Sequence, residues 1–462
     1  MMKKQLTIAL SVAALAMTGC TNQTKQEVDA NPVLTIEGGQ VQGVACETEG
    51  ILAYKGIPFA AVPTGELRWK APQPVEAWDT VMIADHFRNA SYQVPHTEDG
   101  DYGTEFFPED APFSEDCLQL NIWTPSAAAG KADAKLPVAL WIHGGAYMCG
   151  WSFEMEMDGE AWAQRDVILV TANYRLGGLG YLSHPLLTER DGQSGNYGLM
   201  DQIAALKWVK RNIAQFGGDP DNVTVLGQSA GGGSIRCLCI APESKGLMSR
   251  AIIMSAGGIG GRLAEATPQA VADEQGKAVL AAGGLNTLEE MYAATGAEIQ
   301  AAVEKYNAEN NTFVMMPPHV DGKVLTETFD DAALSGSIAD VPYMIGSVAD
   351  DMPGLNQGFQ AFAEARQEKS DKPVFIYHFD APLPDDGRPC LKGSFHSSEL
   401  WFVFHTLKRS WRPFGEADEE LSNRMVDYWT NFAKYGDPNG AEGGDWKPST
   451  KEAPAVFELQ RK

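Results

Sequence analysis

A short glycine-flanked serine motif constrains the fold more than any other feature of the chain. Gly227-Gln228-Ser229-Ala230-Gly231 comes directly after the apolar residues 223–226 and precedes a stretch of small residues. A serine at a sharp strand-to-helix turn requires glycines two residues to either side, because side chains at those positions would clash. The motif therefore predicts a strand, a tight turn that exposes Ser229, and a helix.

Short apolar runs recur along the chain, with helical stretches between them. Their continuous hydrophobicity is typical of strands that are buried on both faces of a sheet. These runs cover residues 138–142, 167–171, 223–226, 251–254, 343–345 and 374–377. Helices are predicted for residues 200–215 and 419–435, and Gly436 lies where a C-cap would. The alternation predicts an α/β fold with a mostly parallel central sheet flanked by helices, and the Ala-rich residues 260–340 are predicted to form a helical cap.

The charge balance restricts the partners of the protein. Its 462 residues include 36 Lys and Arg against 61 Asp and Glu, which gives a net charge of −25. A polyanion such as nucleic acid is therefore not expected as a partner. The charge is typical of a solvated acidic surface.

The N-terminus has the pattern of a targeting segment. A short positive segment precedes the apolar residues 6–17, and small residues then lead to Cys20. This resembles a bacterial lipobox, which predicts a signal peptide over residues 1–19, lipidation of Cys20 and a tether over residues 20–32. The protein is then exported and attached by lipid to the bacterial cell envelope, in the periplasm or at the cell surface. The alternative is a plain secretory signal in which the cysteine occurs by chance.

A second glycine-rich segment provides candidate oxyanion donors. His143-Gly144-Gly145-Ala146 directly follows the predicted strand at residues 138–142. Backbone N–H groups in such a segment can point at a developing oxyanion, and the residue after the nucleophile, Ala230, can supply another donor. Taken alone, the segment would be a simple tight turn.

The histidines that follow the serine are the candidate bases. They are His319, His378, His396 and His405. His319 precedes the best candidates for the acid, and His378 continues the strand predicted at residues 374–377, where a structural role is expected. His396 lies in a loop after that strand, where catalytic groups at a sheet edge are found.

Several ordered motifs together resemble the type B carboxylesterases, the family of the cholinesterases and bacterial p-nitrobenzyl esterases. The resemblance extends from Tyr54 to about Trp446. Its motifs lie at residues 54–60, 114–121, 173–175, 195–198 and 216–220, followed by the serine motif. The resemblance implies an α/β-hydrolase fold over residues 33–462.

This resemblance also implies the roles of individual residues. It makes Ser229 the nucleophile and His396 the base, and it places the acid at Asp351. Asp350 and Glu399 remain as alternative acids. The implied oxyanion donors are Gly145, Ala146 and Ala230.

The implied activity is the hydrolysis of carboxylic esters through a Ser-His-Asp triad and a covalent acyl-enzyme. The substrate is a small-molecule or glycan-linked ester, and no cofactor or metal is required. One alternative is a non-catalytic binding or adhesion protein on the same fold, against which the retained Ser229 and His396 argue. The other is a peptidase or acyltransferase that uses the same triad.

The chain also departs from the family pattern. Gln228 replaces the glutamate that often precedes the serine, which removes a negative charge beside the imidazolium. The family partner of Cys117 would lie near residues 90–93, which contain no cysteine, so a free thiol is expected.

The resemblance further implies two ion pairs, Arg68 with Glu115 and Arg175 with Asp219. Nearby aromatic residues either line an acyl or aryl pocket or belong to the core. They are Phe106, Phe107, Trp151, Trp401 and Phe402.

Overall fold

A ten-stranded sheet forms the centre of this computed structural model, which describes residues 31–94, 101–107, 111–261 and 267–462. Six neighbouring pairs in the sheet, from β8 through β13, are parallel. These strands are β8 (Ile168–Ala172), β7 (Leu136–Ile142), β9 (Gly218–Gln228), β10 (Arg250–Met254), β11 (Tyr343–Val348), β12 (Val374–Phe379) and β13 (Phe457–Leu459). The predicted signal peptide, Cys20 and most of the predicted tether lie outside the described residues.

Antiparallel strands complete the other edge of the sheet. They are β6 (Gln119–Pro125), β4 (Ile51–Pro58) and β3 (Val44–Ala45). A small separate sheet consists of β1 (Val33–Ile36), β2 (Gly39–Gln42) and β5 (Met82–Ile83). The predicted α/β-hydrolase architecture is confirmed, and each of the six predicted strands is present.

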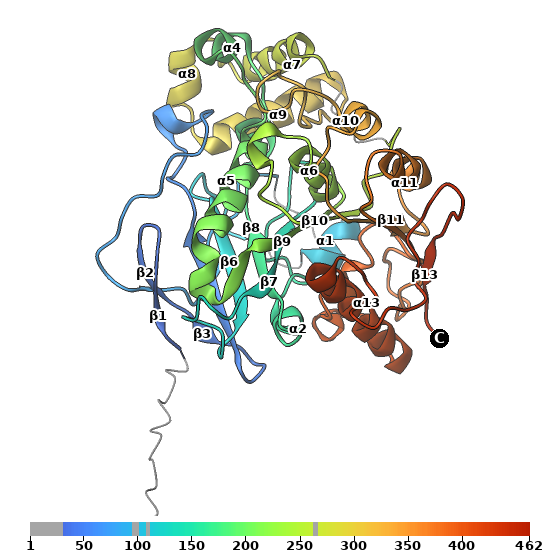
Figure 1. The fold of residues 1–462 in the computed structure, drawn as a ribbon. Helices are drawn as coiled ribbons and strands as arrows, with labels where there is room; N and C mark the ends of the chain where they lie inside the picture. The colour runs from blue at the N-terminus through green and yellow to red at the C-terminus, as the bar shows by residue number, and fades with distance from the viewer. Residues whose placement is uncertain (1–30, 95–100, 108–110, 262–266) are drawn as a thin grey trace, which may run out of the picture.

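Two hydrophobic cores cover the two faces of the sheet, and β7 contributes to both. Val138, Leu140 and Ile142 belong to the core that contains α5 (Tyr197–Asn212) and α6 (Ala230–Leu238). The intervening Ala139 and Trp141 belong to the core of α2 (Glu160–Ala163) and α13 (Glu416–Tyr435). Figure 1 shows α5 and α13 on opposite sides of β7 and β9. The strand is apolar throughout because successive side chains point into different cores.

The two long predicted helices begin slightly earlier than expected. The first, α5, starts at Tyr197, three residues before the predicted start, and a 3₁₀ turn at Ile213–Phe216 continues it. The second, α13, starts at Glu416, three residues before the predicted start, and ends at Tyr435. Gly436 follows as its C-cap in the left-handed conformation, with φ 73°, as predicted. No helix in the described ranges has the length and apolar character needed to cross a membrane.

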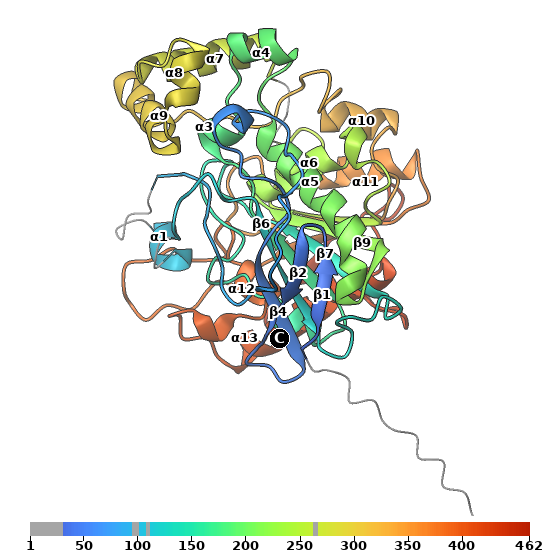
Figure 2. The same ribbon diagram turned by 90° about the vertical axis from the view of Figure 1, so that its left-hand side faces the viewer.

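The segment predicted to form a cap contains four helices. They are α7 (Gln269–Ala282), α8 (Leu288–Ala293), α9 (Gly296–Asn310) and α10 (Phe329–Ser335). Capping boxes fix two of their starts: Thr295 and Glu298 exchange side-chain and backbone hydrogen bonds at α9, and Thr287 does the same at α8. In Figures 1 and 2, α7, α8 and α9 gather with α4 (Pro185–Asp191) at one end of the molecule. Shorter helices elsewhere are α1 (Asp101–Phe106), α3 (Gly177–Gly180), α11 (Phe359–Gln367) and α12 (Leu400–Val403).

One of the two predicted ion pairs is confirmed and the other is wrong. Arg68 donates two hydrogen bonds to Glu115, at 2.7 and 2.5 Å, and both side chains are buried. Arg175 instead pairs with Asp201 of α5 at 2.7 and 2.8 Å. Asp219 accepts a hydrogen bond from the backbone N–H of Asp221 in its own turn. The correction has a physical reason: Arg175 is fully buried, and Asp201 projects from the first turns of α5 into the same interior.

Candidate active site

Ser229 lies at a strained turn between β9 and α6. Its backbone angles, φ 56° and ψ −125°, are uncommon for a residue with a side chain. A Cβ at Gly231 would lie 2.1 Å from the carbonyl oxygen of Ile142, and one at Gly227 would lie 2.6 Å from the backbone of Gly231. The two glycines therefore allow the close approach that the sequence motif predicts. Ser229 itself is only partly buried.

The glycine-rich segment after β7 forms a tight loop beside this turn. Three consecutive residues have positive φ: Gly145 at 99°, Ala146 at 53° and Tyr147 at 61°. A Cβ at Gly145 would lie 2.0 Å from the carbonyl oxygen of Cys149, so this position requires glycine. The carbonyl oxygen of Gly145 accepts the N–H groups of Met148 and Cys149 at 2.8 and 2.9 Å. These two bonds stabilise the loop. Its residue Gly144 packs against Ser229, because a Cβ added at Gly144 would lie 3.2 Å from the Cβ of Ser229.

The predicted oxyanion donors belong to the loop after β7 and to the start of α6. Ala230 is the first residue of α6, where backbone N–H groups have no partner within the helix. Gly145 and Ala146 lie in a loop. Among the backbone hydrogen bonds of loops and turns in the described part of the chain, none is donated by the N–H group of either residue. These groups are free of such backbone bonds, and their role as oxyanion donors stays a prediction.

His396 is paired with Asp351. The Nδ1 of His396 and the Oδ1 of Asp351 are 2.6 Å apart, and the Asp351 side chain is fully buried. The same Oδ1 accepts the backbone N–H of Met352 at 2.8 Å. A carboxylate at this distance requires a proton on Nδ1, which leaves a lone pair on Nε2. The hydroxyl of Tyr102 also donates to the backbone oxygen of His396 at 3.2 Å.

Asp350 has a different position from its neighbour. Its Oδ2 accepts the backbone N–H of Ser394 at 2.8 Å, and its own N–H donates to the carbonyl oxygen of Ser394 at 3.1 Å. An isolated parallel bridge pairs Asp350 with Phe395. Asp350 thus joins the loop after β11, here called the acid loop, to the backbone of the loop that carries His396. The side chain that faces His396 is that of Asp351.

Glu399, the other alternative acid, is completely buried behind the pair. Burial and the nearby charge of Asp351 raise the pKa of Glu399 to about 8. Among the described residues, neither of its carboxyl oxygens has a hydrogen-bond partner at normal distance. The raised pKa favours the neutral acid, and the carboxyl group that contacts Nδ1 of His396 is that of Asp351.

The resemblance implied that residue 228 lies beside the imidazolium, but it did not predict the hydrogen-bond contact that Gln228 makes with His396. The side-chain amide nitrogen of Gln228 lies 3.3 Å from Nε2 of the histidine. Both side chains are buried, with 2% and 5% exposure. Within the described ranges, no hydrogen bond joins the hydroxyl of Ser229 to Nε2, so Gln228 is the protein partner of that nitrogen. Catalytic hydrogen bonds are commonly long before substrate binds and shorten in the substrate complex.

The other histidines have structural surroundings. His143 is buried and stacks on Tyr174 with ring centroids 4.4 Å apart, and burial lowers the pKa of His143 to about 4. His319 contacts the side chain of Gln269 at 3.1 Å. His378 pairs with Glu458 at 2.8 Å on the partly exposed side of β12. None of these three contacts involves Ser229.

Most of the aromatic residues near the motifs belong to the core. Trp401 and Phe402 are fully buried, and Phe106 and Trp151 are each 3% exposed. Phe107 is partly exposed and packs against Trp151 with ring centroids 5.1 Å apart. Cys117 is a buried free thiol, as expected.

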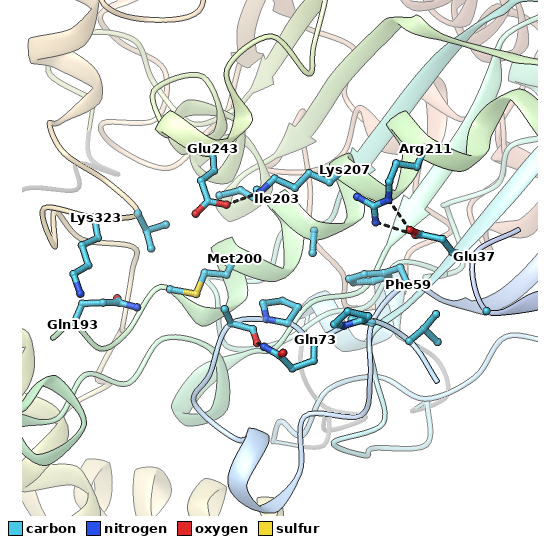
Figure 3. A pocket seen from close by; sticks show the side chains of 18 residues that line it. Glu37, Phe59, Gln73, Gln193, Met200, Ile203, Lys207, Arg211, Glu243 and Lys323 are labelled. Atoms are coloured by element: carbon cyan, nitrogen blue, oxygen red, sulfur yellow. Dashed lines mark hydrogen bonds and ion pairs between the residues drawn. The ribbon is translucent and has the colours of Figure 1, made fainter. Parts of the chain in front are cut away.

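A cavity of about 630 Å³ lies away from this constellation, along α5 (Figure 3). Its wall contains none of the predicted site residues. Two of its basic side chains are paired with carboxylates, Lys207 with Glu243 and Arg211 with Glu37. The candidate active site is therefore the turn at Ser229 with its adjoining loops, and not this cavity.

The chain matches the family model described as "Carboxylesterase family" over residues 30–358 and 354–462. It is 31% identical to the para-nitrobenzyl esterase of Bacillus subtilis, over 90% of this chain and 92% of that protein. It is 35% identical to the fumonisin B1 esterase of Sphingopyxis macrogoltabida, over 96% and 90%. The solved structure of a thermophilic PNB esterase superimposes with a TM-score of 0.82 at 30% identity, covering 93% of this chain and 96% of that one.

Proposed function

Because this chain belongs to the carboxylesterase family and is a serine carboxylesterase, we propose that it cleaves its substrates through a covalent acyl-enzyme on Ser229. The single observation that supports this most strongly is the arrangement at the β9–α6 turn. Ser229 occupies the strained turn, and the neighbouring Gln228 contacts the same histidine that Asp351 holds at 2.6 Å.

Acylation moves a proton from Ser229 through His396 to the leaving alcohol, and it replaces the carbon–alkoxy bond of the ester by a bond to Oγ. The Oγ of Ser229 attacks the carbonyl carbon of the ester while its proton passes to Nε2 of His396. The carbonyl oxygen becomes an oxyanion, which the N–H groups of Gly145, Ala146 and Ala230 stabilise. The bond from carbon to the alkoxy oxygen then breaks, and the imidazolium gives its proton to the leaving alcohol. Asp351 stabilises the imidazolium but does not take its proton.

Deacylation repeats the sequence with water. His396 removes a proton from water, whose oxygen attacks the acyl carbon of the ester on Ser229. The bond from carbon to Oγ breaks, and the proton on His396 returns to Oγ. The products are the carboxylic acid and the free enzyme, so atoms and charge balance over the cycle.

Small-molecule or glycan-linked esters are the proposed substrates. The amide of Gln228 places no charge beside the histidine, so a strong preference for cationic alcohols is not expected. A panel of p-nitrophenyl esters of increasing acyl length, measured beside aryl and glycan-linked esters, would define the specificity.

Pre-steady-state hydrolysis of p-nitrophenyl acetate tests the mechanism. A burst of p-nitrophenol equal to the enzyme concentration is expected wherever deacylation is slower than acylation. Ser229→Ala should lose the burst and nearly all turnover, whereas the matched control Ser234→Ala, in the buried part of α6, should keep both. Undiminished turnover in folded Ser229→Ala would refute the proposal.

A further inference from the structure

We propose that Gln228 is a positioning residue that holds the catalytic histidine in its neutral form between reaction steps. The inference rests on the proposed function, because it concerns the base that serves Ser229. It assigns to Gln228 a role beyond the removal of a charge. The contact between Gln228 and His396 carries it.

The hydrogen-bond chemistry of His396 determines the direction of this contact. Its Nδ1 donates to Asp351 at 2.6 Å, so in the neutral ring Nε2 has only a lone pair. The amide nitrogen of Gln228, 3.3 Å away, carries two N–H groups and no lone pair available for hydrogen bonding. Gln228 must therefore donate, and it can do so only while Nε2 lacks a proton.

The same contact is lost when the histidine is protonated. Once the proton of Ser229 reaches Nε2, two N–H groups face each other, and the amide must turn its oxygen toward the ring or withdraw. The Oε1 of Gln228 already lies beside Gly144, where an added Cβ would be 3.2 Å from it. Gln228 thus stabilises the neutral imidazole relative to the imidazolium, whereas a carboxylate at this position would do the opposite.

The other charged and titratable groups around His396 lie on different sides of the ring. Asp351 faces Nδ1 from the loop after β11. Glu399 and Tyr377 are buried and interact electrostatically with Asp351. Tyr102 of α1 contacts the backbone oxygen of the histidine. All of them remain in a variant of Gln228, so a comparison of variants isolates the group at Nε2.

The test is the pH dependence of kcat/KM for p-nitrophenyl acetate in the full chain. Gln228→Met, which keeps the length but cannot donate, should move the acidic limb of the profile to higher pH by about half to one unit. Gln228→Glu should move it further in the same direction, by more than about one unit, because a carboxylate favours the imidazolium. If Gln228 only filled space, its replacement by Met would leave the acidic limb of the kcat/KM profile at the same pH.

The controls separate this inference from the proposed function. Gln300→Met removes another buried glutamine, on α9, and should leave the limb unchanged. Coincident acidic limbs for the wild type and Gln228→Met, with both proteins folded by circular dichroism, would overturn the role of Gln228. Gln228→Asn, whose shorter amide cannot reach Nε2, gives the same comparison if the methionine variant does not fold. Undiminished turnover in folded Ser229→Ala would instead refute the acyl-enzyme.

Discussion

Adjacent side chains in the acid loop have separate tasks. Asp351 holds the imidazole, and Asp350 binds the backbone N–H of Ser394, two residues before the histidine. Consecutive residues of an extended segment point in opposite directions, so only one of them can face His396. Both aspartates contribute to the position of the histidine, one through the ring and the other through the chain.

Replacement of each aspartate by asparagine should separate these tasks. Asp351→Asn should lower kcat by about 10⁴, because an amide favours the wrong tautomer of the histidine and cannot stabilise the imidazolium. Asp350→Asn keeps an acceptor for the N–H of Ser394, so its loss in kcat should be much smaller. Steady-state kinetics on both folded variants decide the matter, and a larger loss in Asp350→Asn would show that the acid has been assigned to the wrong residue.

Glu399 should make the stability of the protein depend on pH. Its pKa is raised to about 8 in the fold, against 4.5 for the free side chain, so the folded state binds the extra proton between these values. The contribution of Glu399 to the free energy of unfolding therefore falls as pH rises from about 5 to 8, by about 4 kcal/mol. Glu399→Gln removes this loss.

Urea unfolding at a series of pH values measures the effect. The stability of Glu399→Gln relative to the wild type should increase as the pH is raised toward 8. Because the other buried carboxyls are common to both proteins, they do not alter the difference. Parallel stability curves for the two proteins would show that Glu399 is already ionised in the fold.

Single residues also show what the sequence could and could not predict at the site. Ser229 follows from the local glycine spacing, and its turn has the expected geometry. The contact of Gln228 with His396 joins residues 168 positions apart, and it depends on side-chain orientations that no local pattern specifies. The raised pKa of Glu399 likewise depends on burial by distant segments.

At the scale of elements, the strands were predictable because their residues are buried on both sides. The run of apolar residues in β7 reflects the two cores that it separates. The predicted helix boundaries were less accurate. The helix α5 starts within residues 195–198, whose glycines do not suggest a helix. The partner of Arg175 was mispredicted for a related reason, because the approach of α5 to this arginine is a tertiary contact.

The ion pair between Arg175 and Asp201 should stabilise the junction between α5 and the loop after β8. Asp201→Asn would leave a fully buried guanidinium without a counterion, at an expected cost of about 3–5 kcal/mol. Asp219→Asn is the matched control, since that carboxylate accepts the N–H of Asp221 in its own turn, and should cost less than about 1 kcal/mol. Denaturant unfolding compares the two variants, and equal costs would contradict the importance of the pair.

For the whole molecule, attachment to a membrane stays a prediction from the N-terminal sequence. The mature protein should lack residues 1–19 and carry a diacylglyceryl group on Cys20. Intact mass spectrometry of protein isolated from a membrane fraction measures both features together. Cys20→Ser should abolish the lipid mass and release the protein from that fraction. Cleavage elsewhere, without lipid, would establish the plain secretory alternative.

We infer that Ser229, activated by His396, is the nucleophile of this carboxylesterase. Labelling with a fluorophosphonate probe reports on this role, because such a probe forms a stable bond only with an activated serine. Tandem mass spectrometry of the digested protein should locate the adduct on Ser229, with labelling absent in Ser229→Ala and strongly slowed in His396→Ala. An adduct on another serine, or equal labelling of folded Ser229→Ala, would contradict the claim.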